Sequence, residues 1–163
     1  MKILVFSDSH SSRWFMRQCV DSVQPDAIIH LGDMVSDGEV LAEEYPHLKV
    51  FQVAGNCDRG RVTPDFPEVL LEKLAGVRIY MTHGHRQGVK LYLDKLILDA
   101  QRCQADVILY GHTHEPDCRK LPEGAWIMNP GSAGYGGTAG IILIEDGRAE
   151  CRLLRPGRTE GAI

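Results

Sequence analysis

Hydrophobic and polar positions in the first third of the chain form two kinds of segment in alternation. Continuous apolar runs, which are typical of strands buried on both faces, occur at residues 2–6 (KILVF), 26–33 (DAIIHLGD) and 48–53 (LKVFQV). Two helices are expected between them, over residues 11–23 and 37–45, because serines precede the first and a proline follows each. This order predicts right-handed strand–helix–strand crossovers and a parallel sheet.

The second half of the chain has a different pattern. Residues 68–85 predict two strands around a tight turn, and residues 89–103 predict the longest helix. Residues 106–114 predict one more strand and its loop, while residues 118–131 and 138–155 each predict a hairpin.

These elements predict an α/β fold. The parallel half and the antiparallel half are expected to form two mixed sheets packed face to face, with helices outside. We expect one domain over residues 1–155 and a flexible C-terminal tail over residues 156–163.

Composition narrows the function classes. The chain has 163 residues, 44% hydrophobic and 25% charged, with a net charge of −4 and no lysine- or arginine-rich run. A long nucleic acid or an anionic membrane is therefore disfavoured as a partner, because both usually require a basic face. No apolar stretch approaches the length of a membrane span. The five cysteines are scattered and form no CxxC motif, which predicts a reduced, cytoplasmic protein.

Polar residues follow the ends of the predicted strands, in the segments SDSH, LGD, GNCD, THGH and YGHTH, with NPGS after a later strand. Loops at the carboxyl ends of parallel strands converge on one crevice, so these side chains are expected to meet. Their carboxylate, imidazole and carboxamide groups suit mixed nitrogen and oxygen coordination of manganese, iron, cobalt, nickel or catalytic zinc. The candidate ligands are Asp8, His10, Asp33, Asn56, His83, His112 and His114.

The charge of such a site indicates its substrate. If Asp33 bridges two divalent ions, each ion receives four of these ligands. Two ions, two carboxylates and a bridging hydroxide leave a charge of about +1, which favours an anionic substrate and a phosphoryl centre.

The motifs D-x-H, GD, GN-x-D, H and GH-x-H, in this order, resemble those of the calcineurin-like metallophosphoesterases over residues 2 to about 155. GNCD in place of GNHD, and NPGS, are similar to the small bacterial and archaeal phosphodiesterase branch, which also resembles the eukaryotic retromer scaffold subunit. The resemblance implies a four-layer α/β/β/α sandwich and two divalent ions, commonly manganese, with nickel, iron, cobalt or zinc also accepted. It assigns Asp8, His10, Asp33 and His114 to one ion, and Asp33, Asn56, His83 and His112 to the other.

The resemblance leaves the roles of several other residues open. Cys57 stands where the wider family has a histidine that protonates the leaving group, and a thiol is a poor substitute. We expect Cys57 to be a small, half-buried filler, with contact to substrate or metal as the alternative. Asp33 and Asn56 are expected to serve catalysis as metal ligands. For Asp58 a catalytic role and a turn-capping role are both open.

Other polar residues near the motifs are candidates for contact with the substrate or with the metal ligands. His85, Arg59 and Asn129 belong to this group, although an ordinary solvated surface arginine is the favoured interpretation of Arg59. His30, inside a strand, is expected to be a satisfied core histidine. Trp14 and Tyr135 are expected to be packing residues, with a base-stacking platform as the less favoured alternative.

Together these features predict a metal-dependent phosphodiesterase that acts on a small phosphodiester by means of a hydroxide bridging two metal ions. The first alternative is an interaction scaffold that binds metal but turns over weakly. The second is a protein serine/threonine phosphatase, which the short chain and Cys57 disfavour. Association into a homo-oligomer is an open expectation, since small members of this family often associate.

Overall fold

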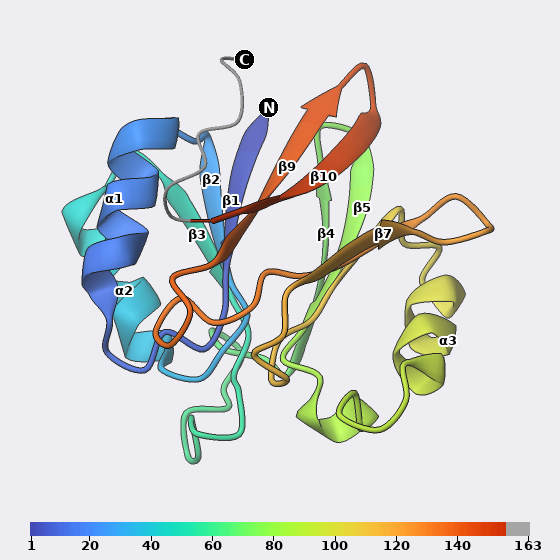
Figure 1. Cartoon of the computed structure of the whole chain (residues 1–163), viewed down its shortest axis with the longest axis horizontal. Helices are drawn as coiled ribbons and strands as arrows, with labels where there is room; N and C mark the ends of the chain where they lie inside the picture. The colour runs from blue at the N-terminus through green and yellow to red at the C-terminus, as the bar shows by residue number, and fades with distance from the viewer. Residues whose placement is uncertain (156–163) are drawn as a thin grey trace.

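The computed structural model describes residues 1–155 of the chain, and the expected tail lies outside these residues (Figure 1). Ten strands, three α-helices and one short 3-10 helix are found in the described part. Within residues 1–155, none of the helices has both the length and the apolar composition that a membrane span requires.

The first sheet has the strand order β10–β9–β1–β2–β3. Its strands are β1 (Lys2–Phe6), β2 (Ala27–His30), β3 (Lys49–Gln52), β9 (Ala139–Glu145) and β10 (Arg148–Leu154). β1, β2 and β3 run parallel, as their continuous apolar sequences predict, with Val5 opposite Ile29 and Ile29 opposite Phe51. The final hairpin extends this sheet, because β9 pairs antiparallel with β1.

The second sheet has the order β4–β5–β6–β8–β7. Its strands are β4 (Val69–Leu74), β5 (Val77–Thr82), β6 (Val107–Leu109), β7 (Asp117–Lys120) and β8 (Trp126–Asn129). β5, β6 and β8 run parallel, whereas β4 and β7 are antiparallel edge strands. Both sheets are therefore mixed, as predicted. The assignment of one half of the chain to each sheet is wrong, because the final hairpin (β9 and β10) joins the first sheet.

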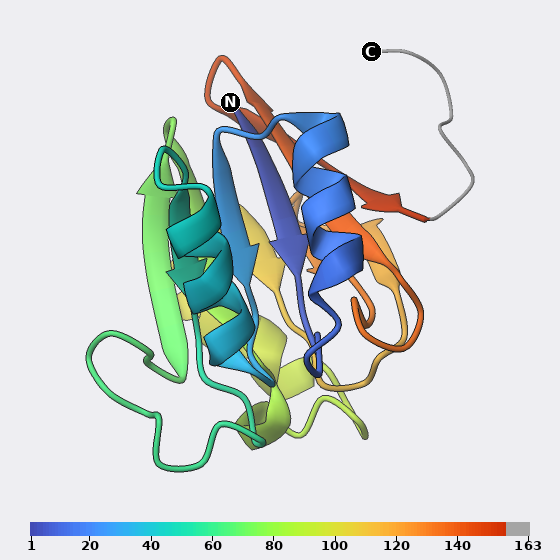
Figure 2. The same ribbon diagram turned by 90° about the vertical axis from the view of Figure 1, so that its left-hand side faces the viewer.

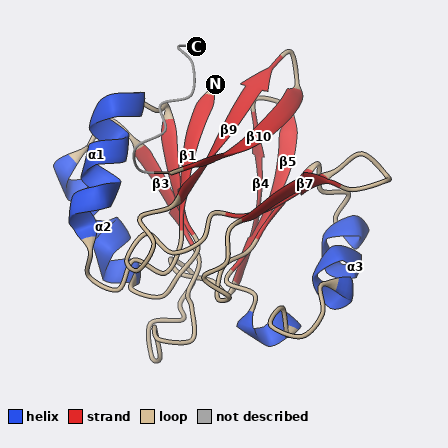
Figure 3. Cartoon of the chain, viewed as in Figure 1, coloured by secondary structure: helices blue, strands red, loops and turns tan. Residues whose placement is uncertain are grey.

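Helices cover the outer faces of the two sheets. α1 (Arg13–Val23) and α2 (Val35–Glu44) lie side by side on the first sheet, and α3 (Asp94–Arg102) lies on the second (Figures 1 and 2). One cluster of buried residues fills the space between the sheets. A second cluster lies between the first sheet and α1 and α2, and a third lies between the second sheet and α3. The predicted α/β/β/α sandwich is thus confirmed (Figure 3).

The longest helix was predicted over residues 89–103, and this prediction is wrong. α3 has 9 residues and α1 has 11. The 3-10 helix η1 (His85–Gln87) ends at Gly88, whose φ of 71° starts a turn that carries the chain to α3. Leu91 and Tyr92 in this turn are 79% and 74% exposed, so their apolar character does not reflect a buried helix face.

Candidate metal centre and active site

The loops that follow β1, β2 and β6 hold their polar residues in an unusual backbone conformation. Asp8, His10, Asp33, His112 and His114 have φ values of 53°, 45°, 54°, 70° and 63°. L-residues rarely adopt this left-handed region, and non-glycine residues there gather at functional sites, where the surrounding structure maintains the strain. The candidate ligands are therefore placed by their loops at a cost in stability.

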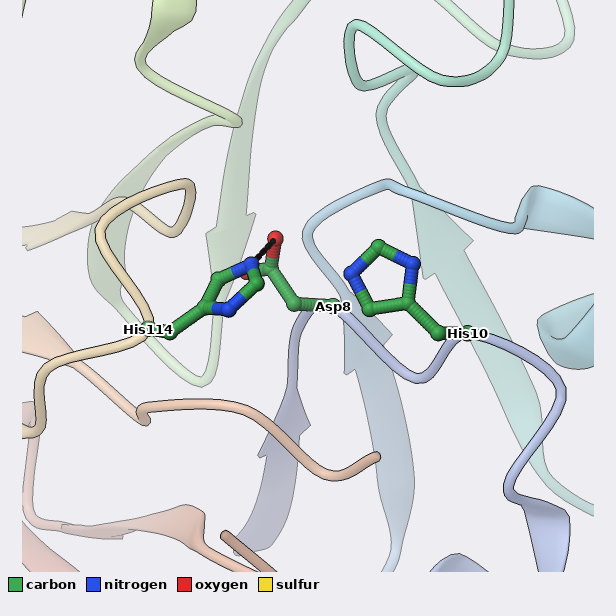
Figure 4. Close-up of side chains that lie close together, drawn as sticks. All are labelled: Asp8, His10 and His114. Atoms are coloured by element: carbon green, nitrogen blue, oxygen red, sulfur yellow. Dashed lines mark ion pairs between the residues drawn. The ribbon is translucent and has the colours of Figure 1, made fainter. Parts of the chain in front are cut away.

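Asp8 lies at the centre of the site. Its buried carboxylate accepts hydrogen bonds at Oδ2 from Ser7 Oγ (2.5 Å) and the His112 N–H (3.0 Å). Its Oδ1 is also buried but accepts no hydrogen bond, and it lies 3.0 Å from Nε2 of His114. Figure 4 shows His114 and His10 on either side of this carboxylate. Nε2 of His10 is likewise buried without a hydrogen-bond partner.

A close approach of the loops makes this arrangement possible. A Cβ on Gly111 would lie 2.0 Å from Ser7 Oγ and 2.9 Å from Asp8 Oδ2. Any side chain at position 111 would therefore displace the loop that carries His112 and His114 from the Asp8 carboxylate.

A second group of donors surrounds His83. Its ring Nδ1 lies 2.8 Å from the carbonyl oxygen of Leu31, which holds the proton on Nδ1 and leaves the lone pair of Nε2 facing the site. That Nε2 lies 3.1 Å from Asn56 Oδ1 and 3.5 Å from Asp33 Oδ1. None of these three atoms carries a proton that it could donate to the others. A cation between them would interact favourably with the lone pairs of all three. The ring of His112 lies 5.1 Å from that of His83.

The residues present fit a pair of divalent cations. In each of two groups, the candidate donor atoms lie within 4.8 Å of one another, so one ion could bind them together. The first group is Asp8, His10 and His114, and the second is Asp8, Asp33 and His83. Asn56 and His112 adjoin the second group. Asp8 is common to both groups, so a bridging role for Asp33 stays a prediction.

The pKa values of His112 and Asp33 are both lowered, which favours a neutral imidazole and an ionised carboxylate. Burial, then the charges of His83 and Lys90, lowers the pKa of His112 to about 4, so its ring is free to bind a cation at neutral pH. Burial alone would raise the pKa of Asp33. In the metal-free site, attraction to the His83 ring in its protonated form, and then the hydrogen bond from the Cys57 N–H, outweigh burial and hold the pKa of Asp33 below its usual value.

Asp58 is 5% exposed and binds backbone rather than solvent. Its carboxylate accepts four backbone N–H bonds at 2.8–3.0 Å, from Asp33, Met34, Val35 and Gly55. These bonds tie the Asn56 loop to the Asp33 loop and to the first turn of α2. The contacts are those of the turn-capping role that the sequence left open.

Cys57 is exposed, so the prediction of a half-buried filler is wrong. Desolvation of its sulfur, followed by the hydrogen bond and charge of Asp33, raises the pKa of the thiol to about 11. Its backbone N–H donates to Asp33 Oδ1 at 2.8 Å, so this residue helps to hold a candidate ligand through its main chain.

The remaining candidates lie around this centre. His85 has a buried Nδ1 without a hydrogen-bond partner, and its ring is 5.5 Å from that of His83. Asn129 is fully buried and donates from Nδ2 to Gly111 O (3.1 Å) and Thr113 Oγ1 (2.9 Å), which supports the loop between His112 and His114. Arg59 is exposed in the loop after Asp58.

Sequence reasoning missed a buried polar chain beneath the Asp8 loop. The Gly32 N–H donates to His30 Nδ1 (3.3 Å), His30 Nε2 lies 3.0 Å from Ser9 Oγ, and this hydroxyl donates to Asp37 Oδ2 (2.7 Å). His30 is a satisfied core histidine, as predicted. Its partners could not be anticipated, because Ser9 and Asp37 carry no motif of their own.

Two aromatic residues contradict the sequence-based interpretation. Trp14 and Tyr135, expected to be packing residues, are 67% and 76% exposed. Tyr135 lies against the rings of His10 and His114.

Known proteins resemble this chain in sequence. Residues 1–145 match the calcineurin-like phosphoesterase superfamily domain. The chain belongs to this family. A curated relative, the phosphodiesterase YfcE of Escherichia coli, is 31% identical over 156 residues, which cover 81% of this chain and 79% of that protein.

Solved structures of other proteins share the fold of this chain. A predicted phosphoesterase from Streptococcus pneumoniae superposes with a TM-score of 0.74 at 28% identity, covering 96% of this chain and 93% of that one. Vps29 from Entamoeba histolytica, solved in complex with zinc, superposes with a TM-score of 0.72 at 20% identity, covering 94% and 98%. This second likeness concerns the fold alone.

Proposed function

We propose that this member of the phosphoesterase family is a metal-dependent phosphodiesterase with two divalent ions, of which manganese is the first candidate. The observation that carries the proposal is the gathering of carboxylate, carboxamide and imidazole donor atoms around Asp8 and His83, in which Asp8 Oδ1 and His10 Nε2 are buried without a hydrogen bond. Two bound ions would neutralise the phosphate charge and supply a bridging hydroxide as nucleophile.

The chain's own residues provide orientation and charge. Asp8 and Asp33 contribute two negative charges, and neutral histidines and Asn56 contribute none, so the loaded site stays positive toward an anionic ester. Ser7 and the His112 N–H hold the Asp8 carboxylate, and Leu31 holds the His83 ring. The substrate phosphate would thus meet a preorganised site.

The residue at position 57 favours diesters with good leaving groups. A thiol is a weak hydrogen-bond donor, so Cys57 is poorly suited to protonate an alkoxide leaving group. Aryl phosphodiesters need little protonation as they depart. We expect these to be cleaved much faster than alkyl diesters or monoesters.

A scaffold function is the second candidate. The structural likeness to Vps29 and the neighbouring exposed side chains of Leu91 and Tyr92 favour it. The intact ligand set favours catalysis, since a scaffold alone does not need strained residues around unpartnered donor atoms.

The test is the hydrolysis of bis(para-nitrophenyl) phosphate and of the matching monoester. The protein is stripped of metal, Mn²⁺ is added back, and Asp33→Asn is assayed beside the wild type. Asp65→Asn, which alters an exposed carboxylate, is the matched control. We expect diester cleavage that requires metal, is lost in Asp33→Asn and persists in the control. Two Mn²⁺ bound per chain without cleavage would favour the scaffold.

A further inference from the structure

Tyr135 is an exposed aromatic residue placed directly on the metal ligands. It lies in the turn between β8 and β9. Its ring stacks on that of His114, with centroids 5.6 Å apart and an interplanar angle of 19°. The centroid of the His10 ring is 5.0 Å away. Although it contacts two histidines, the residue is 76% exposed, so much of the ring remains open to solvent.

The position of this ring is fixed by the backbone around it. The Tyr135 N–H donates to Ser132 Oγ (2.9 Å), and that hydroxyl donates to the carbonyl oxygen of Asp8 (2.8 Å). The Gly134 N–H donates to the same Asp8 carbonyl at 3.2 Å. A Cβ at Gly134 would lie 2.5 Å from the Ser9 carbonyl oxygen, so glycine is required for this approach. The turn is therefore built onto the loop that carries Asp8 and His10.

Core packing does not account for this arrangement. An aromatic side chain contributes to stability chiefly through the area that it removes from water, and Tyr135 removes little. The hydrogen bonds of its turn instead hold a solvent-exposed aromatic ring next to the rings of two candidate ligands, His10 and His114.

We propose that Tyr135 is a specificity-determining residue that stacks on an aromatic ester group of the phosphodiester. The inference rests on the proposed function and deepens it. The Tyr135 ring lies 5.0 Å and 5.6 Å from the rings of His10 and His114. An aryl ester group of a phosphate held beside these histidines would therefore come within the roughly 4.5–7 Å at which aromatic pairs interact. The site thereby selects aryl or heteroaryl esters over alkyl esters by binding, independently of how easily the leaving group departs.

The experiment separates binding from leaving-group chemistry by keeping the leaving group constant. Phenyl para-nitrophenyl phosphate and methyl para-nitrophenyl phosphate both release para-nitrophenol, and they differ only in the retained group. The kcat and KM of both are measured for the Mn²⁺-loaded wild type, Tyr135→Ala and Tyr135→Phe. Trp14→Ala, which removes another exposed aromatic ring, is the matched control.

A second readout does not depend on turnover. Phenylphosphonate and methylphosphonate contain a phosphorus–carbon bond that hydrolysis does not cleave, and calorimetry gives their affinities for the same four Mn²⁺-loaded proteins. Bound Mn²⁺ per chain is measured in parallel, because Tyr135 also touches two candidate ligands.

We expect the wild type to prefer the phenyl compounds, through KM and affinity, and Tyr135→Ala to reduce this preference by about five-fold. Tyr135→Phe and Trp14→Ala should retain it. An unchanged preference in Tyr135→Ala would overturn the inference. So would an equal loss on phenyl and methyl compounds together with weaker Mn²⁺ binding, which would make Tyr135 a support for the histidines. If the wild type cleaves neither ester, the proposed function fails, and the phosphonate affinities still decide the role of Tyr135.

Discussion

Asp58 connects two loops that carry candidate metal ligands. Its carboxylate accepts N–H bonds from Asp33, Met34, Val35 and Gly55 in a buried setting. In Asp58→Asn one oxygen becomes an NH₂ group that cannot accept them. We expect the metal-free protein to lose about 2–3 kcal/mol of unfolding free energy in urea titrations, because buried N–H donors are left without partners.

The matched control for Asp58→Asn is Asp65→Asn, which makes the same chemical change at an exposed position. We expect it to change stability by less than about 0.5 kcal/mol. Equal stabilities of the two variants, combined with a fall in kcat for Asp58→Asn alone, would contradict the capping role and favour the catalytic one.

At the residue scale, the sequence predicted the candidate ligands of the site better than it predicted the groups that hold those ligands in place. The candidate ligands were found because each follows a predicted strand, and the structure brings them together around Asp8 and His83. The partners of Asp58 are backbone groups, which leave no trace in side-chain identity. The exposure of Cys57 and Tyr135 depends on how far their loops project, and apolar or aromatic character alone does not report this.

At the scale of the elements, His30 on β2 links three segments. Its hydrogen bonds connect the β2 loop, through Ser9 on the β1 loop, to Asp37 on α2. Burial, which outweighs the charge of Asp37, lowers the pKa of His30. The folded protein therefore keeps this histidine neutral.

This histidine makes stability dependent on pH. As pH falls below about 6.5, the unfolded chain takes up a proton on His30 that the folded protein does not, so the folded state is destabilised by up to about 1.4 kcal/mol per pH unit. We expect His30→Gln to show a smaller loss of unfolding free energy than the wild type between about pH 7 and about pH 5. Urea unfolding of the metal-free proteins across this pH range measures that loss of unfolding free energy. His47→Gln, at an exposed histidine, should keep the wild-type dependence, and an identical dependence in all three proteins would contradict the argument.

The elements themselves were largely predictable. β1 has a continuous apolar run and α1 has a helical spacing of apolar residues, and both have clear boundaries. α3 was extended wrongly because Leu91 and Tyr92 continue a helical pattern of apolar residues, although the turn at Gly88 exposes both. The mixed character of the sheets was predicted, but the sheet that the final hairpin joins was not, because local sequence contains no record of that choice.

At the scale of the whole molecule, the site lies where the two sheets meet. Asp8, His10, Asp33 and Asn56 come from loops of the first sheet, and His83, His112 and His114 come from loops of the second. Bound ions would therefore connect the two halves of the sandwich, in addition to the apolar cluster between the sheets. Metal binding and global stability should be coupled.

Removal of metal should consequently lower the melting temperature. A site with free metal at about one hundred times its Kd stabilises the folded state by about 2.7 kcal/mol, which corresponds to about 5–10 °C for a chain of this size. We expect this difference between the Mn²⁺-loaded and the chelator-treated protein in thermal unfolding followed by circular dichroism. Asp8→Asn should abolish most of it, since both groups of candidate ligands share Asp8, whereas Asp65→Asn should retain it. Equal melting temperatures with Mn²⁺ and with chelator would show that the sheets meet without help from metal, and would remove the main support for a dinuclear site.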